Sequence, residues 1–287
     1  MSSIDGKTKL LAIFGNPVEH SKSPRMHNAN FAYLGINAAY VPLRPGIDRI
    51  GDAVKGFRAM GFLGANVTIP FKERVGEFLD ELSPVAKFTG SVNTLYWKDG
   101  IIGGTLCGTT TDPYGALLNL KEAGVDVKGK LVALLGNGGA ARAIAFSLLE
   151  HGARLAIVCR DRSKGEALSE ALRGAFPGTS APKVFLFAEF QRIAGVDIIL
   201  NATSVGMTPN EDTSPLPEDV LLPRHFVYDI IYAPAETKLM REAKAAGCKV
   251  LGGSAMLVYQ GAKSFEFWFP GKTADVSVMK KALGMEA

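Results

Sequence analysis

The stretch Leu131-Val132-Ala133-Leu134-Leu135-Gly136-Asn137-Gly138-Gly139-Ala140-Ala141 decides the fold of this chain. It is an apolar run that ends in glycines and leads into an apolar helical pattern, the strand–turn–helix setting that G-x-G-x-x-A requires. Gly136 permits the tight turn, Gly138 lets a pyrophosphate approach backbone N–H groups, and Ala141 lets the helix lie close to the strand. The N-terminus of that helix favours an anion. The sequence therefore predicts a dinucleotide-binding turn, with an ordinary tight strand–helix turn as the alternative.

Short apolar runs alternate with helical patterns on both sides of this turn. Candidate parallel strands lie at 155–159, 184–187, 196–200, 226–231 and 248–251 on its C-terminal side, and at 10–14, 39–43 and 63–68 on its N-terminal side. Residues 91–97 and 101–107, joined around Asp99-Gly100, predict an antiparallel hairpin, because Asp-Gly favours a two-residue turn. The alternation predicts βαβ units around largely parallel sheets, with a change of character near residue 110.

The composition excludes several classes of protein. A length of 287 residues is about twice that of a usual single domain, so two domains are expected. Hydrophobic residues make up 47% and charged residues 21%, a balance that excludes a disordered chain. The net charge of +4 is mild and no dense run of Lys and Arg occurs, so no nucleic-acid partner is expected. No apolar stretch approaches the roughly 20 residues of a membrane-spanning helix.

Cysteine and histidine usage argues against a metal site. Cys107, Cys159 and Cys248 are odd in number and widely spaced, without the pairing of metal ligands. The four histidines form no ligand spacing either, so a structural metal is not expected. A reduced, cytoplasmic compartment fits this cysteine usage best.

A positively charged loop follows the second predicted strand after the dinucleotide turn. It reads Cys159-Arg160-Asp161-Arg162-Ser163-Lys164. An acidic residue near this point holds the ribose 2′-hydroxyl of NAD, whereas arginine accommodates the 2′-phosphate of NADP. Arg160, Arg162 and Lys164 therefore favour NADP, and Asp161 argues against it because a carboxylate would repel phosphate. A solvated loop that caps the next helix is the alternative.

Two polar segments interrupt the apolar pattern of the first half. Ser21 and Ser23 precede a helix whose first turn accommodates Pro24, so Ser23 is either a binding group or a simple N-cap. In the run Asn66-Val67-Thr68-Ile69-Pro70-Phe71-Lys72, the strand pattern stops at a proline beside a lysine. A surface lysine is ordinarily a solvated charge, so the position alone does not establish a function for Lys72.

Polar residues also mark the passage into the second half. Asn93-Thr94 is a polar intrusion into an otherwise apolar strand. Asp112 follows Thr111 at the expected domain junction, where clefts commonly lie. Its alternative role is to cap the helix that follows.

Taken together, these segments resemble the shikimate dehydrogenase family over nearly the whole chain. Seven matching segments follow one another in the family's order: Gly15-Asn16-Pro17 with Ser21-Lys22-Ser23-Pro24, Gly64 to Lys72, Ser91-Val92-Asn93-Thr94, Thr111-Asp112, Gly136 to Ala140, Asn201-Ala202-Thr203-Ser204-Val205-Gly206-Met207, and Met256-Leu257-Val258-Tyr259-Gln260. Any one of them could arise by chance, whereas seven in order are not plausibly accidental.

The resemblance implies a fold and a reaction. It implies an α/β protein with an N-terminal substrate domain around a mainly parallel sheet (residues 1–111 plus 253–287) and a Rossmann-type NADP-binding domain (112–252). The C-terminal helices are expected to return to the first domain. The implied reaction is reversible, NADP-dependent reduction of 3-dehydroshikimate to shikimate on the route to chorismate and aromatic amino acids. A homodimer is expected by resemblance alone.

The resemblance also assigns roles to individual residues. Lys72 and Asp112 match the catalytic pair, in which an ammonium beside the reacting oxygen meets the negative charge that develops there and the carboxylate orients it. The substrate-binding positions are Ser21, Ser23, Thr68, Asn93, Tyr232 and Gln260. The cofactor-binding positions are Gly136, Asn137, Gly138, Gly139, Ala140, Arg160, Arg162, Lys164, Thr203, Ile230 and Gly253. Asp112 is expected to contact the substrate as well.

Several positions depart from the family pattern. Thr110 stands where asparagine usually precedes Thr-Asp, and Cys159 and Asp161 replace an asparagine and a threonine common in the NADP loop. Gly253-Ser254-Ala255-Met256 replaces a common Gly-Leu-Gly-Met. A quinate or aminoshikimate dehydrogenase of the same family, using NAD or NADP, therefore remains an alternative. A catalytically silent cofactor-binding module is disfavoured because both Lys72 and Asp112 are present.

Overall fold

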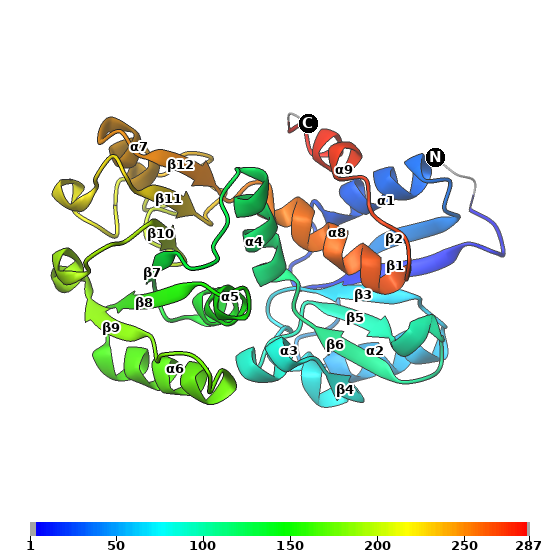
Figure 1. The fold of residues 1–287 in the computed structure, drawn as a ribbon. Coiled ribbons are helices and arrows are strands. Elements are labelled where there is room, and N and C mark those ends of the chain that lie inside the picture. The colour runs from blue at the N-terminus through cyan, green and yellow to red at the C-terminus, as the bar shows by residue number, and fades with distance from the viewer. Residues whose placement is uncertain (1–3, 286–287) are drawn as a thin grey trace. The chain divides into compact units, whose positions relative to one another are not determined.

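The structure is a computed structural model that describes residues 4–285, so residues 1–3 and 286–287 of the predicted domain limits lie outside it. Its contacts divide the chain into two compact units. The first runs up to Thr111 and resumes at Val258, and the second comprises Asp112–Leu257. Each unit is built around its own sheet with helices packed on it (Figure 1). The predicted α/β class with two domains is confirmed.

The first unit carries a mixed sheet with strand order β2-β1-β3-β5-β6-β4. Its elements are β1 (Lys9–Phe14), α1 (Ser23–Tyr33), β2 (Ala38–Leu43), α2 (Ile50–Ala59), β3 (Gly64–Val67), β4 (Glu81–Leu82), α3 (Pro84–Thr89), β5 (Thr94–Trp97), β6 (Leu106–Thr109), α8 (Met256–Trp268) and α9 (Val276–Ala282). Strand β1 is parallel to both β2 and β3, whereas β5 is antiparallel to β3 and β6.

Strand β1 is apolar on both faces because both faces are covered. Leu11 and Ile13 belong to a core cluster that includes residues of α1, α8 and α9. Ala12 and Phe14, which point the other way, belong to a cluster with α2. The continuous apolar run in the sequence therefore reflects a central strand with helices on both sides of the sheet.

The hairpin prediction is confirmed in its antiparallel pairing and is wrong in its second strand. Trp97 pairs with Leu106, so β6 begins five residues later than the apolar pattern suggested. Asp99 and Gly100 do have the positive φ angles, 55° and 72°, of a turn, but residues 98–105 separate the two strands, so the connection is not a two-residue turn. Ile101 and Ile102, which were read as strand, are exposed in the loop before the ladder starts.

The second unit carries a parallel sheet with strand order β12-β11-β10-β7-β8-β9. Its elements are α4 (Asp112–Glu122), β7 (Leu131–Leu135), α5 (Gly139–Glu150), β8 (Arg154–Cys159), α6 (Arg162–Ala175), β9 (Lys183–Leu186), β10 (Ile198–Asn201), β11 (Phe226–Asp229), α7 (Lys238–Ala245) and β12 (Lys249–Gly252).

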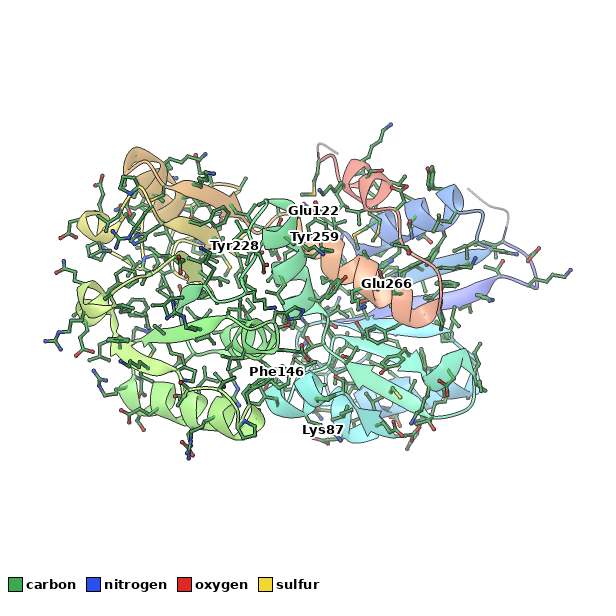
Figure 2. The ribbon with its side chains drawn as sticks, in the orientation of Figure 1. Lys87, Glu122, Phe146, Tyr228, Tyr259 and Glu266 are labelled. Carbon is green, nitrogen blue, oxygen red and sulfur yellow. The ribbon has the colours of Figure 1, made fainter. Side chains whose placement is uncertain are left out.

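This strand order is that of a doubly wound Rossmann-type sheet. The chain runs outward from β7 through β8 to β9, then returns to the other side of β7 and continues through β10, β11 and β12. Ligands of such sheets bind outside the carboxyl ends of the strands at the point where the order reverses, here at β7 and β10. Helix α4 is tied to this sheet by Asn119, whose Nδ2 donates to the hydroxyl of Tyr228 at 3.2 Å and to the carbonyl of Gly252 at 2.9 Å. Tyr228, which comes from strand β11, is labelled in Figure 2.

No helix within residues 4–285 combines the length and the apolar character needed to cross a lipid bilayer.

His27 on α1 is a fully buried member of the first unit's core. Its ring stacks on Tyr40, with centroids 4.6 Å apart, and lies 5.0 Å from the ring of Trp268. Neither ring nitrogen has a hydrogen-bond partner among the described residues. Burial without a partner disfavours the charged form and lowers the pKa of His27 to about 3. The residue therefore acts as a neutral aromatic packing group.

This burial predicts a specific acid sensitivity. The unfolded chain takes up a proton at His27 near pH 6.5, whereas the folded chain does so only near pH 3. The free energy of unfolding therefore falls as the pH drops below the higher value, by up to ~1.4 kcal/mol per pH unit from this residue. Urea unfolding at a series of pH values should show a shallower acid slope for His27→Leu than for the wild-type chain. Parallel slopes would contradict the buried, neutral state.

Candidate functional site

Asn93 is the centre of a buried polar cluster in the first unit. Its Oδ1 accepts hydrogen bonds from the Thr111 N–H at 2.9 Å and from the Thr94 hydroxyl at 2.7 Å. Its Nδ2 donates to the Thr111 hydroxyl at 3.1 Å and lies 3.4 Å from Gln260 Oε1. Asn93 and Gln260, both predicted to bind substrate, are thus brought together by β5 and α8. Thr111 joins them from the chain that follows β6.

Ser23 connects to the same cluster through Tyr40 and Asn66. The Tyr40 hydroxyl donates to Asn66 Oδ1 at 2.7 Å and also hydrogen-bonds with the Ser23 side chain. Asn66 Nδ2 in turn donates to the Asn93 carbonyl and to the Ser264 hydroxyl, each at 3.0 Å. Burial raises the pKa of Tyr40 well above its ordinary value, so the phenol stays neutral.

The structure excludes the simple N-cap role for Ser23, whereas its role in substrate binding stays a prediction. Lys22 occupies the N-cap position of α1, and Ser23 is the first helical residue. The Ser23 hydroxyl is therefore engaged with Tyr40 and is not a helix cap. The Ser21 hydroxyl accepts the Ser23 N–H at 3.3 Å, so the two predicted binding serines stand together at the start of α1.

Thr68 and Lys72 lie in the chain that leaves strand β3. The Thr68 N–H donates to the Phe14 carbonyl at 2.8 Å, and its methyl group occupies the space that a Cβ on Gly15 would need, at 2.5 Å. Lys72 is half-buried, and its carbonyl accepts the N–H of Val92 at 2.8 Å. This bond holds the backbone of Lys72 against Val92, the residue that precedes Asn93.

These predicted residues share one edge of the first sheet. Gly15 and Thr68 follow the carboxyl ends of the parallel strands β1 and β3. Asn93 precedes β5, which runs antiparallel to β3, so the start of β5 lies at the end of β3, with Asn66 opposite Thr94. The end of β6 reaches the same edge, since Thr109 pairs with Thr94. A predominantly neutral set of hydroxyl and amide groups therefore gathers there.

The glycine-rich turn of the second unit lies at the strand-order reversal. Gly136 has a φ of +107°, and a Cβ on it would lie 3.1 Å from the Thr203 methyl group and 3.2 Å from the Ala202 carbonyl oxygen. A Cβ on Gly138 or Gly139 would meet nothing within 4 Å. The backbone at the start of α5 is therefore open for a ligand to approach, as the motif predicts.

A hollow of about 300 Å³ surrounds this turn. Its lining residues come from the ends of β7, β8 and β10 and from the segment after β9: Gly136, Asn137, Gly138, Cys159, Arg160, Phe187, Ala202, Thr203, Ser204 and Val205. Asn137 Nδ2 is buried and has no hydrogen-bond partner among the described residues. An unpartnered amide donor beside an open glycine turn fits the oxygens of a dinucleotide.

The charged loop after β8 divides its residues between the hollow and helix α6. Arg160 lines the hollow with its side chain exposed. Asp161 is the N-cap of α6, and its Oδ1 accepts the Lys164 N–H at 3.1 Å. The Arg162 guanidinium pairs with Glu189 and donates to the Val184 carbonyl at 3.2 Å. The Lys164 ammonium is largely exposed, 3.9 Å from Asp161.

This arrangement gives Asp161, the carboxylate that argued against NADP, a structural role. Asp161 caps a helix, so its position in the sequence does not by itself indicate a ribose-binding role. Arg160 is the cation that faces the hollow, and the places of Arg162 and Lys164 in cofactor binding stay predictions.

The remaining candidates lie at the ends of β11 and β12 and at the start of α4. A Cβ on Gly253 would lie 2.0 Å from the carbonyl oxygen of Ile230, so only glycine fits there. Tyr232 is 66% exposed and belongs, with Asp112, to the second unit, whereas the other predicted substrate residues belong to the first. Asp112 is the first residue of α4. Lys72 belongs to the first unit and Asp112 to the second, so their catalytic pairing stays a prediction.

Sequence reasoning missed several groups that hold the candidates in place. Asn66 was noted as polar but was given no role, and Tyr40 carried no signal because an aromatic residue in a strand is ordinarily core. Ser264 lies one helical turn after Gln260, a spacing that does place both on one face of α8. Within the described part of the chain, no group of His, Cys, Asp and Glu residues is arranged to hold a metal ion.

A doubly wound sheet with a glycine-rich turn at its reversal point, joined in one chain to a second α/β unit, defines the two-domain class of dinucleotide-dependent oxidoreductases. Family models described as "Shikimate dehydrogenase substrate binding domain" and "Shikimate 5'-dehydrogenase C-terminal domain" match residues 13–95 and 253–283. Shikimate dehydrogenase (NADP(+)) of Moorella thermoacetica is 42% identical over 99% of this chain and 95% of its own length. That of Symbiobacterium thermophilum is 43% identical over 98% and 95%. The chain belongs to the shikimate dehydrogenase family.

Solved structures support the same conclusion. A shikimate dehydrogenase in complex with NADP+ has a TM-score of 0.88 and 38% identity, covering 98% of this chain and 96% of its own. Shikimate 5-dehydrogenase from Listeria monocytogenes in complex with shikimate and NAD has a TM-score of 0.89 and 37% identity, covering 99% of each chain. Quinate dehydrogenase from Corynebacterium glutamicum in complex with NAD is 30% identical with a TM-score of 0.84, covering 96% of this chain and 98% of its own.

Gly253 and Gly138, both in the second unit's candidate site, predict unequal losses of stability from one added methyl group. Gly253→Ala should lower the free energy of unfolding by ~1–3 kcal/mol, because the new Cβ meets backbone that must shift. Gly138→Ala, whose Cβ points into open space, should stay within about 0.5 kcal/mol of the wild type. Urea unfolding of both variants checks this. Equal losses would show that the contact at Gly253 is not what demands a glycine.

Proposed function

We propose that this chain catalyses the reversible NADPH-dependent reduction of 3-dehydroshikimate to shikimate, a step toward chorismate and the aromatic amino acids. The observation that supports the proposal most directly is the buried cluster around Thr111. The side chains of Asn93 and Gln260 hydrogen-bond with Thr111, the residue that directly precedes the predicted catalytic Asp112 in the chain. The relatives that carry this activity in their names match nearly the full length of the chain.

The groups at the first sheet's edge suit a hydroxylated ring. Ser21, Ser23, Thr68, Asn93 and Gln260 supply hydroxyls and amides that both donate and accept hydrogen bonds. Tyr232 is the predicted contribution of the second unit. A site built to pair with hydroxyl groups rejects analogues that lack them, because its own buried polar groups are then left without partners.

The second unit supplies the residues that would hold NADP(H). The turn at Gly136, Asn137, Gly138, Gly139 and Ala140 would take the pyrophosphate at the N-terminus of α5. Arg160 would take the 2′-phosphate, Thr203 would contact the cofactor beside the glycine turn, and Ile230 and Gly253 would border the nicotinamide. When bound, NADPH supplies a hydride to the ketone carbon of the substrate.

Lys72 and Asp112 complete the proposed chemistry. As the ketone carbon is reduced, negative charge develops on its oxygen, and the Lys72 ammonium stabilises that charge and donates a proton to the oxygen. The Asp112 carboxylate orients the ammonium. In the direction of oxidation, the neutral amine of Lys72 takes the hydroxyl proton.

Removing the amine should affect turnover far more than binding. Lys72→Ala is expected to lower kcat by about 10²–10⁴, the usual contribution of a positioned acid–base group, with the KM for shikimate changed little. Steady-state rates in both directions give the result. Lys55→Ala, an exposed lysine on α2, is the matched control and should keep full activity. Near-normal turnover of the Lys72→Ala enzyme would show that Lys72 is not the acid–base group.

Arg160 should determine the preference for NADPH over NADH. Arg160→Ala is expected to raise the KM for NADPH at least about tenfold and to leave the KM for NADH nearly unchanged, because only NADPH carries the 2′-phosphate. Arg173→Ala, which removes a surface cation of α6 paired with Glu170, serves as the control for net charge. An equal rise for both cofactors would mean that Arg160 does not read the phosphate.

A quinate or aminoshikimate dehydrogenase is the second candidate function. The support for this second candidate is that the chain shares its fold with a quinate dehydrogenase whose structure was solved in complex with NAD. The two serines at the start of α1 favour shikimate. An absorbance assay at the nicotinamide band, with shikimate, quinate and aminoshikimate against NADP+ and NAD+, separates the two: a quinate rate above the shikimate rate selects the second candidate.

A cytoplasmic location and a homodimeric state belong to the same proposal. All three cysteines are free and buried, as expected for a reducing cytoplasm. We propose a homodimer from the resemblance to the family, which light scattering of the purified chain measures directly.

A further inference from the structure

Asp229, at the end of β11, is a buried carboxylate to which none of the roles above refers. Its side chain is fully buried, and both of its oxygens accept hydrogen bonds. Oδ1 accepts the Ile231 N–H at 3.0 Å, and Oδ2 accepts the Thr237 hydroxyl at 2.8 Å. Asn201 Nδ2, at the end of the neighbouring strand β10, lies 3.1 Å from each oxygen. Every one of these partners is a donor, so the ionised carboxylate fits this environment.

The carboxylate fixes the orientation of the Asn201 side-chain amide. An ionised carboxylate only accepts hydrogen bonds, so the amide must turn its NH₂ group toward Asp229. The amide oxygen then points the other way, where it accepts the Thr203 N–H at 3.0 Å and the Thr203 hydroxyl at 2.7 Å. The Thr203 hydroxyl oxygen in turn accepts the Val205 N–H at 3.1 Å. A continuous chain of hydrogen bonds therefore leads from Asp229 to the segment 202–205.

Both ends of this chain lead to predicted cofactor residues. Ala202, Thr203, Ser204 and Val205 line the hollow at the glycine turn, and the Thr203 methyl group packs against Gly136. On the other side, the bond from Asp229 to the Ile231 N–H anchors the chain directly after Ile230. The Ile231 carbonyl accepts the Gly253 N–H at 3.3 Å. One carboxylate therefore holds the segment after β10 and the segment after β11 in register.

We infer that Asp229 is a positioning residue of the cofactor site, which aligns the Thr203 and Ile230 segments through the fixed amide of Asn201. This inference rests on the proposed function, because it takes the hollow at the glycine turn to be the site of NADP(H). Asp229 is not one of the residues that line the hollow, and it acts through Asn201 and the Ile231 N–H.

Asp229→Asn tests the inference with little change in size. An amide at position 229 can both donate and accept, so it no longer forces the Asn201 amide into one orientation. NADPH binding to the purified enzyme without substrate, followed by nicotinamide fluorescence, should weaken about tenfold, the size of one hydrogen bond's contribution. Thermal unfolding without cofactor is measured in parallel.

Asp197→Asn is the matched control. Asp197 precedes β10, at the opposite end of the same sheet, where its carboxylate accepts the Leu131 N–H at 2.8 Å and lies 3.5 Å from the Lys130 ammonium. This variant should lower the melting temperature and leave the Kd for NADPH unchanged. If Asp229→Asn behaves in the same way, Asp229 has only a structural role and the inference fails.

Thr203→Val supplies an independent arm that keeps the methyl contact and removes the hydroxyl. It should weaken NADPH binding, and Asp229→Asn combined with Thr203→Val should bind no more weakly than the weaker single variant, since both act through one chain of bonds. Additive losses overturn the inference. If Asp229→Asn does not fold, Thr203→Val decides alone, and an unchanged Kd overturns the inference.

Arg160→Ala separates this inference from the function on which it rests. If Arg160→Ala leaves the Kd for NADPH unchanged, the hollow is not the cofactor site and the proposed cofactor assignment fails. If Arg160→Ala weakens binding while Asp229→Asn and Thr203→Val do not, the cofactor assignment stands and only the positioning role of Asp229 is wrong.

Discussion

The hydrogen bonds between the Asn93 side chain and Thr111 are the contact on which the first unit's polar edge depends. Amide groups buried this deeply must be paired, because an unpaired one costs free energy comparable to a lost hydrogen bond. Asn93 meets this requirement by taking the Thr111 N–H and Thr94 hydroxyl on its oxygen and giving its NH₂ to the Thr111 hydroxyl. The direction of the chain as it leaves β6 is therefore set by Asn93, the residue that directly precedes β5.

In the second unit the buried polar group is a carboxylate, Asp229, and it too must be paired by hydrogen bonds. Asp229 is taken out of water, and burial raises the pKa of its carboxyl while the bonds from Ile231, Asn201 and Thr237 act in the opposite direction. In both units, buried polar groups at the carboxyl ends of strands convert a general α/β framework into one defined set of loop positions. The sheets themselves depend on apolar packing, whereas these loops depend on completed hydrogen bonding.

The sequence predicted the parts of the molecule whose cause is local. The glycine turn, the helix that follows it and the alternating strands are each visible in a short window, because turn geometry and side-chain periodicity act over a few residues. The predicted second strand of the hairpin began too early, at Ile101 and Ile102. An apolar pair after a turn looks the same in sequence whether the strand pairing starts there or, as here, at Leu106. Ser23 and Asp161 each had two local interpretations. The position of Ser23 inside α1, after the N-cap Lys22, excludes capping by the serine, whereas the bond from the Lys164 N–H shows that Asp161 is a cap. Tyr40 and Asn66 could not be found in advance because their partners are far away in the sequence. Ser264 did carry a local signal, its spacing of one helical turn from Gln260.

Trp268 shows what it means for the first unit to be assembled from both ends of the chain. Its indole packs where a Cβ on Gly64 would come within 2.1 Å of the ring, and its Nε1 donates to the Leu95 carbonyl at 3.0 Å. The N-terminal strands therefore lack their covering helix until the last part of the polypeptide has been made. During synthesis on the ribosome, the uninterrupted second unit can mature first, while the early segment waits with α1 as the only cover on one face of its sheet.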